Sequence, residues 1–249
     1  MSNARLSAKK IAAYAGYEPS RISVFDELPS TNTYLAALAR EGAPAGRVIL
    51  AEAQSAGRRR MGRSFFSPAG SGIYLSVLVR PKTLDAGKLT TLAAVVVSDA
   101  ILSVCGIQVG IKWVNDLIFD SKKLCGILAE GAGGEYAVLG IGINVKKSAF
   151  PPELAQIATS LEQATGTAPD RNRLVAEILQ RLANADLEGT SHMEEYRRRS
   201  LTLGKWVTVL GSGESVFVRA IADDGALLVE DQNGKTRRIA SGEVSVRNI

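Results

Sequence analysis

Two apolar runs constrain the fold more than any other feature of the chain. They are residues 46–54 (GRVILAEAQ) and 71–81 (SGIYLSVLVRP), and runs of this length predict strands buried within a sheet. The loop between them carries four arginines within six residues, Arg58, Arg59, Arg60 and Arg63. Such a run of charge is typical of a solvated loop. The sequence therefore predicts two core strands joined by a long basic loop.

Helix and strand patterns continue along the first 202 residues. Further strands are predicted at residues 21–28, 111–119, 123–130 and 136–145. The second and third of these form a hairpin that turns at residues 120–122. Helices are predicted at residues 31–40, 86–106 and 171–185. Ser30 or Thr31 can cap the first of these helices, and Asp170 can cap the last.

The pattern changes in residues 203–249, where short β-segments are separated by the turn sequences GSGE, DDG and QNG. This spacing predicts a small all-β barrel. The sequence therefore predicts an α+β chain of two domains. Residues 1–202 form a central mixed β-sheet flanked by helices, and residues 203–249 form the barrel.

The small number of histidine and cysteine residues argues against several kinds of catalytic and metal site. His192 is the single histidine of the chain, and it lies in a polar segment predicted to be a surface helix. Ser-His-Asp triads, Cys-His dyads and histidine-rich zinc sites are therefore not expected. Cys105 and Cys125 lie in apolar runs, which indicates buried thiols in a reducing compartment.

Charge and targeting patterns point to an ordinary cytoplasmic protein. The net charge of +5 fits an anionic ligand without requiring a nucleic acid. The N-terminal 20 residues lack the apolar stretch of a signal peptide. No window of about 18 apolar residues without charge predicts a transmembrane helix.

The arginine loop has the composition of a clamp for an acidic small molecule. Gly57 and the other glycines of the loop allow tight turns and close backbone approach to a ligand. Guanidinium groups bind phosphates and carboxylates in a bidentate manner. The segment lacks a Walker sequence, so it is not a P-loop. On these residues alone, an exposed basic loop without a ligand remains the alternative.

A second group of polar residues lies in the predicted hairpin. Lys112, Asn115 and Asp116 interrupt its first strand, and adjacent Asn and Asp side chains can hold a nucleotide or Mg²⁺. Lys123 begins the second strand, where its charge can face an anion beside the open backbone of Gly126. A satisfied structural pair remains the alternative for Asn115 and Asp116.

Taken in order and with their spacing, these segments resemble the catalytic domain of biotin protein ligases. The matching segments are STN at residues 30–32, AEAQSAGRRRMGRSFFSPAGSGIYLS, KWVND, KLCGIL and GIGIN. The later GALLVED and SGEVSVR resemble the end of that family's small barrel. The resemblance extends from about residue 26 to residue 247. It implies a fold like that of class II aminoacyl-tRNA synthetases and biotin synthetases, with a C-terminal SH3-like barrel.

The resemblance also implies an activity, that of a biotin–[acetyl-CoA-carboxylase] ligase. Such an enzyme joins biotin and ATP as biotinyl-5′-AMP and then transfers biotin to one lysine of a biotin carboxyl carrier protein. Biotin and ATP would be substrates, Mg²⁺ would be the metal, and no tightly bound prosthetic group is implied.

Each matching residue acquires an implied role. Residues that would contact biotin are Ser30, Thr31, Asn32, Gln54, Gly57, Arg58, Arg59, Arg60, Lys123, Gly126 and Leu128. Residues that would bind ATP are Arg60, Arg63, Phe65, Lys112, Asn115, Asp116, Asn144 and Arg247, with Asp116 also a ligand of Mg²⁺. Catalysis would rest on Lys123, Arg58 and Arg60, because attack of a carboxylate on a phosphate builds up negative charge.

The sequence departs from the family pattern at three positions. Arg59 stands in place of a glycine, Phe65 in place of a tryptophan and Val114 in place of a proline. Only about 25 residues precede the first catalytic strand, too few for the winged helix-turn-helix domain of repressor-type ligases. We therefore expect a ligase that binds neither DNA nor membrane.

Three questions stay open at this point. A homodimer is possible because the predicted sheet has a free edge. A lipoate or octanoate ligase is an alternative activity with the same adenylation chemistry. A basic nucleic-acid-binding module that uses the arginine runs is an alternative of a different class.

Overall fold

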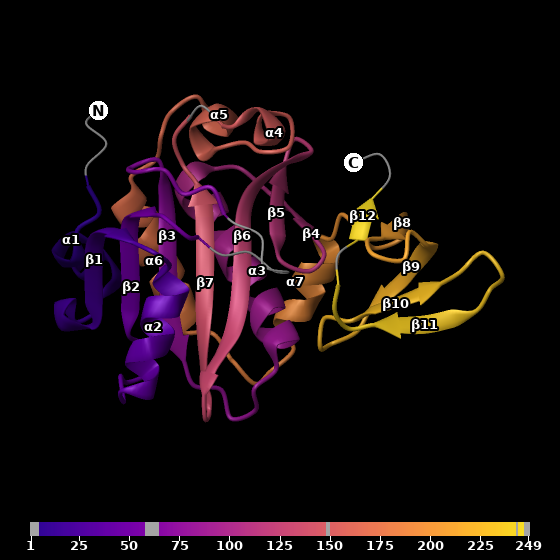
Figure 1. Cartoon of the computed structure of the whole chain (residues 1–249), viewed down its shortest axis with the longest axis horizontal. Helices are drawn as coiled ribbons and strands as arrows, with labels where there is room; N and C mark the ends of the chain where they lie inside the picture. The colour runs from indigo at the N-terminus through magenta and orange to yellow at the C-terminus, as the bar shows by residue number, and fades with distance from the viewer. Residues whose placement is uncertain (1–4, 58–64, 148–149, 243, 247–249) are drawn as a thin grey trace.

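A seven-stranded sheet forms the centre of the molecule (Figure 1). The computed structural model describes residues 5–57, 65–147, 150–242 and 244–246. The strand order is β1-β2-β3-β7-β6-β5-β4, in which β1 and β2 are parallel and the other neighbours antiparallel. The predicted mixed sheet is thus confirmed. The strands are β1 (Ile22–Leu28), β2 (Val48–Gln54), β3 (Gly72–Val79), β4 (Gly110–Lys112), β5 (Asp116–Phe119), β6 (Lys122–Gly133) and β7 (Tyr136–Asn144).

Alternation along the central strands gives the sheet two different faces. One face packs in a large apolar core with α1 (Ala8–Ala15), α3 (Ala86–Cys105), α6 (Arg171–Ala183) and α7 (His192–Arg198). The opposite face is covered in part by α2 (Thr31–Arg40), whose Leu35 and Ala39 pack near Leu78 and Val138. Figure 1 shows α2 in front of the sheet and α6 behind it.

The caps predicted from the sequence are confirmed at α2 and α6. Ser30 Oγ accepts a hydrogen bond from the backbone N–H of Thr33, and the Asp170 carboxylate accepts one from that of Asn172 at 2.8 Å. These bonds satisfy N–H groups that the first turn of a helix leaves unpaired. Shorter helical turns follow at η1 (Pro19–Arg21), α4 (Pro152–Ala155) and α5 (Leu161–Thr165).

α3 is the core helix predicted for residues 86–106. Among the described residues it is the one helix long and apolar enough to cross a membrane by length and composition. However, 67% of that stretch is buried within the fold. Its apolar character is therefore explained by packing against the sheet.

The single strand predicted at residues 111–119 is wrong, because two short strands separated by a turn lie there. β4 and β5 pair with each other, so that Lys112 lies opposite Asp116. Trp113 occupies the turn, and the peptide bond that follows it is cis. The backbone N–H of Trp113 donates to Thr202 Oγ1 at 3.1 Å, and its indole N–H donates to the Gly225 carbonyl at 2.7 Å. These bonds hold a turn where the apolar pattern predicted a continuous strand.

The chain ends in a second, antiparallel sheet of order β11-β10-β9-β8-β12. Its strands are β8 (Trp206–Val209), β9 (Ser215–Ile221), β10 (Leu227–Glu230), β11 (Thr236–Ile239) and β12 (Val244–Val246). This small all-β unit agrees with the predicted SH3-like barrel. In Figure 1 it lies beside the β4 end of the large sheet, and the Gly225 carbonyl connects it to Trp113. The domain boundary at residue 203 stays a prediction.

His192 is half-buried rather than a solvated surface residue, which corrects the sequence interpretation. Its Nε2 lies 3.0 Å from Thr91 Oγ1, whose hydroxyl also donates to the Lys88 carbonyl at 2.9 Å. Because the hydroxyl has one hydrogen, the imidazole N–H must donate to Thr91. Burial, followed by the nearby charges of Lys88 and Arg197, lowers the pKa of His192.

We expect this lowered pKa to make stability depend on pH. As pH falls below about 6.5, the unfolded chain protonates His192 before the folded chain does, so stability is lost. The change His192→Gln keeps a donor for Thr91 and removes the titration. Between pH 7.5 and 5.5 the melting temperature of the wild type should fall further than that of the variant. Parallel curves for the two proteins would contradict the assignment, since all other titrating groups are shared.

Candidate active site

A pocket lies on the same face of the sheet as α2, in the part of that face that the helix does not cover. Its walls come from the start of α2, the end of β2 and the central strands β3, β6 and β7. The lining residues are Ser30, Thr31, Asn32, Gln54, Phe65, Tyr74, Leu75, Asn115, Lys123, Gly126, Ile127, Leu128, Gly140, Ile141 and Gly142. Segments far apart in the sequence therefore meet here.

The α2 end of the pocket is a network of hydrogen bonds among buried side chains. Gln54 Oε1 accepts from the backbone N–H of Thr31 at 2.9 Å and lies 3.1 Å from its hydroxyl. Ser76 Oγ lies 2.8 Å from Thr31 Oγ1 and donates to Asn32 Oδ1 at 2.6 Å. These side chains can offer both donors and acceptors to a polar ring.

The same network reaches the stems of the arginine loop. Gln54 Nε2 donates to Ser67 Oγ at 3.1 Å, and Ser67 Oγ donates to the Phe65 carbonyl at 2.9 Å. The Phe65 N–H donates to the Gly57 carbonyl at 2.8 Å, so the two stems are bonded to each other. The position of the loop stems is therefore tied to the side chains at the α2 end of the pocket.

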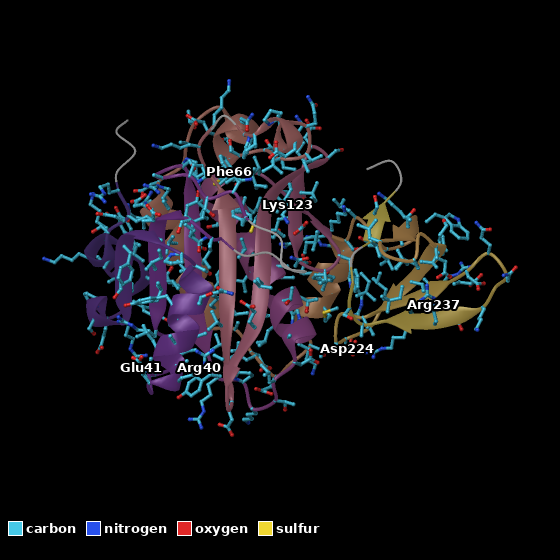
Figure 2. The ribbon with its side chains drawn as sticks, viewed as in Figure 1. Arg40, Glu41, Phe66, Lys123, Asp224 and Arg237 are labelled. Atoms are coloured by element: carbon cyan, nitrogen blue, oxygen red, sulfur yellow. The ribbon has the colours of Figure 1, made fainter. Side chains whose placement is uncertain are left out.

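The opposite end of the pocket carries a charged pair. The Lys123 ammonium group donates to Asp116 Oδ1 at 2.5 Å, and both side chains are largely buried. Asn115 Nδ2 donates to the Ile127 carbonyl at 2.9 Å, which fixes the turn beside β6. Figure 2 shows Lys123 and Phe66 at the same end of the large sheet. The pair presents one cation, already oriented by a carboxylate, to whatever binds between the two ends.

Two glycines of β7 make room for side chains over the sheet. A Cβ atom at Gly140 would lie 2.2 Å from Asn32 Oδ1, and one at Gly142 would lie 2.8 Å from the Phe65 ring. The Asn32 amide and the Phe65 ring therefore occupy the space over these two glycines.

The pairing of β6 with β7 sets the length of the pocket. Gly126 is paired with Gly142, and Leu128 with Gly140. The Lys123 ammonium group lies beside Gly126, whereas the Asn32 amide lies beside Gly140. Two strand residues, about 7 Å, therefore separate the cationic end from the polar end. An elongated ligand with a polar ring at one end and an anion at the other matches this spacing.

The Tyr74 phenol of the pocket and the two cysteines of the chain do not supply nucleophiles at neutral pH. Burial raises the pKa of Tyr74 to about 12, and its hydroxyl donates to the Pro68 carbonyl at 2.9 Å. Burial also raises the pKa of the Cys125 thiol, which lies on the core face of β6. Cys105 is only partly buried, contrary to the sequence interpretation, and its pKa is raised to about 11. Neutral thiols are poor nucleophiles, so lysine and hydrogen-bonding groups dominate this site.

Most of the described residues proposed from the sequence meet in this pocket. Those that line it are Ser30, Thr31, Asn32, Gln54, Phe65, Asn115, Lys123, Gly126 and Leu128. Gly57 lies against Gln54 and Ser67 at the loop stem, and Asp116 reaches the pocket through Lys123. Arg58, Arg59, Arg60, Arg63 and Arg247 lie outside the described residues.

Two predicted nucleotide contacts lie just beyond the lining. Asn144 Nδ2 donates to the Thr159 carbonyl at 3.0 Å, which ties the end of β7 to the segment before α5. Lys112 ends β4 opposite Asp116. Their roles toward ATP stay predictions.

The polar residues of the site that were missed from the sequence are Tyr74, Ser76 and Glu130. Ser76 is a single serine in the apolar run of β3, and it is fully buried. Glu130 contacts Asn32, which lies 98 positions away in the chain. The one available signal was a polar residue on the pocket face of an otherwise apolar strand.

Family profiles match both parts of the chain. Residues 24–146 match the Biotin/lipoate A/B protein ligase family, and residues 202–247 match the Biotin protein ligase C terminal domain. The second match covers the small β-sheet described above.

Known proteins match along nearly the whole chain. The biotin–[acetyl-CoA-carboxylase] ligase of Mycobacterium tuberculosis is 37% identical over 253 aligned residues, and the match covers 94% of this chain and 91% of that protein. The bifunctional ligase/repressor BirA of Bacillus spizizenii is 36% identical, with 89% of this chain and 72% of that protein covered. The structure of the Aquifex aeolicus biotin protein ligase in complex with biotin and ATP superposes with a TM-score of 0.80 at 29% identity, over 91% of this chain and 98% of that one. The chain therefore belongs to the biotin protein ligases of the biotin/lipoate protein ligase family.

Proposed function

We propose that this chain activates biotin with ATP as biotinyl-5′-AMP and transfers it to a lysine of a biotin carboxyl carrier protein, the acetyl-CoA carboxylase subunit. One observation carries the proposal: the Lys123 cation and the Thr31–Asn32 polar end lie about two strand residues apart in one pocket. Biotin has a polar ureido ring at one end and a carboxylate at the other. The names of the relatives above support the same assignment.

In the first step, an oxygen of the biotin carboxylate forms a bond to the α-phosphorus of ATP. The bond from that phosphorus to pyrophosphate breaks, and pyrophosphate leaves with the electron pair. Two anions must approach each other, so a fixed cation lowers the barrier more than a base would. We expect Lys123 to supply that charge, and its ion pair with Asp116 supports this because it orients the ammonium group in advance.

Mg²⁺ is the metal that this chemistry implies, and the described side chains fit a loosely held ion. Among the described residues no group of three His, Cys, Asp or Glu side chains could hold a metal ion. Mg²⁺ usually needs only one or two carboxylates together with substrate phosphates and water. Asp116 is the carboxylate we propose, and the ion would neutralise phosphate charge when bound. It would compete with Lys123 for that carboxylate.

In the second step, the amine nitrogen of the carrier lysine bonds to the acyl carbon of biotinyl-5′-AMP. The bond from that carbon to the phosphate oxygen breaks, AMP leaves, and the nitrogen loses a proton. The carrier supplies its own nucleophile, so the chain need only hold the activated acid. The absence of DNA binding and a cytoplasmic location stay predictions.

Transfer to a carrier domain tests the proposal directly. The full chain is incubated with ATP, Mg²⁺, a biotin carboxyl carrier domain and either biotin or lipoate. Mass spectrometry should show one biotin on the carrier lysine and no lipoate, because a dithiolane ring offers no N–H or carbonyl to the polar end of the pocket. A carrier unchanged by biotin would contradict the proposal, and one modified by lipoate would favour the lipoate ligase alternative.

A further inference from the structure

Glu130 contacts the polar end of the pocket without lining it. The residue lies on β6, and its Oε2 accepts a hydrogen bond from Asn32 Nδ2 at 2.9 Å. Asn32 is 6% exposed. The carboxylate therefore stands behind a side chain that faces the proposed ligand.

The carboxylate determines which way the Asn32 amide points. Glu130 Oε2 and the Leu128 carbonyl, 3.5 Å away, can only accept hydrogen bonds. The nitrogen of the amide must face these two oxygens, so the amide oxygen faces Ser76 Oγ, 2.6 Å away. A flipped amide would place oxygen against a carboxylate.

The orientation of the amide then sets the direction of the neighbouring hydroxyls. Asn32 Oδ1 can only accept, so the single hydrogen of the Ser76 hydroxyl goes to it. Thr31 must then donate its own hydrogen to Ser76 Oγ or to Gln54 Oε1, at 2.8 or 3.1 Å. Either choice leaves the lone pairs of Thr31 Oγ1 to accept from a ligand. The polar end of the pocket thus presents a hydrogen-bond acceptor, Thr31 Oγ1, to the N–H groups of a ligand ring.

We propose that Glu130 is a positioning residue that makes this end of the pocket selective for a ring carrying N–H donors. The inference rests on the proposed function and deepens it. Glu130 acts through Asn32, Ser76 and Thr31, and it does not touch the reacting carboxylate. Its loss should therefore weaken recognition of the ring and leave the lysine end unchanged.

The test compares Glu130→Met with Glu130→Gln and a control, Glu135→Met. Methionine keeps the length of the side chain without an acceptor, whereas glutamine keeps an acceptor without the charge. Glu135 lies in the same β6–β7 hairpin region but pairs with Arg80 at the surface. Calorimetry measures the biotin Kd, and steady-state kinetics measures the KM for ATP.

We expect Glu130→Met to raise the biotin Kd about tenfold, the size of effect typical of a lost hydrogen bond to a charged group. The KM for ATP should stay within about twofold, Glu130→Gln should recover most of the loss, and Glu135→Met should change neither constant. In an Asn32→Ala background, Glu130→Met should cause no further loss, because the two residues act in series.

Three results would overturn the inference: an unchanged biotin Kd in Glu130→Met, an equal loss for biotin and ATP, or full additivity with Asn32→Ala. These are distinct from failure of the proposed function, which would show as a wild-type chain that binds no biotin. Melting curves of each variant identify a change that comes only from lost stability.

Discussion

Replacing Lys123 with methionine is expected to lower kcat for biotinyl-5′-AMP formation by about 10²–10³-fold, the cost of removing one well-placed donor at a developing charge. The Kd for biotin should rise by less than about tenfold. Methionine keeps the stem that packs beside Gly126 and removes the ammonium group. The difference between the two effects arises because the charge on the phosphate oxygens grows only as the reaction proceeds.

The matched control is Lys122→Met, one residue earlier on the same strand. Lys122 lies opposite Phe119 at the start of β6 and does not line the pocket. Pyrophosphate release measures the first step, and calorimetry measures biotin binding. Equal losses in kcat and in biotin affinity would show that Lys123 binds the ground state rather than stabilising the transition state. A slow Lys122 variant would show that general charge in the hairpin is responsible.

Local sequence patterns were sufficient for the elements that build the site. Apolar runs predicted β2 and β3, the core helix was predicted at residues 86–106, and the caps Ser30 and Asp170 were confirmed. These signals depend on residues within a few positions of each other, so one sequence contains them. The family resemblance then located Lys123 and Asn32, which lie on separate elements of one pocket.

The contacts that orient the site could not be predicted in this way. Ser76 contacts Asn32 across 44 positions, and Glu130 contacts it across 98. No periodicity links such residues, because their proximity depends on strand order in the completed sheet. The prediction of a continuous strand missed the turn at Trp113 for the same reason. The hydrogen-bond partners of Trp113 are Thr202 and Gly225, which follow about 90 to 110 positions later in the chain.

One further long-range contact supports the stems of the arginine loop. Arg171 Nη1 donates to Glu52 Oε2 at 2.7 Å and to the Gly72 carbonyl at 3.0 Å, and Arg171 is 2% exposed. Glu52 lies on β2 two residues before Gln54, and its Oε1 accepts from the Leu6 N–H at 2.7 Å. The buried pair thus connects α6 and the N-terminal segment to both strands that flank the loop.

We expect Arg171→Met to lower the free energy of unfolding by about 3–5 kcal/mol, because it leaves the Glu52 carboxylate buried without its counter-charge. Arg173→Met is the control on the same helix, since Arg173 lies over the Tyr14 ring at the surface and should cost under about 1 kcal/mol. Adding Glu52→Gln to Arg171→Met should recover part of the lost free energy of unfolding, because it removes the buried charge that has no counter-charge. Urea unfolding measures the wild type, the single variants Arg171→Met, Glu52→Gln and Arg173→Met, and the double variant. If the double variant were as unstable as the sum of the single changes, the cost would come from lost packing of the Arg171 side chain rather than from the uncompensated charge.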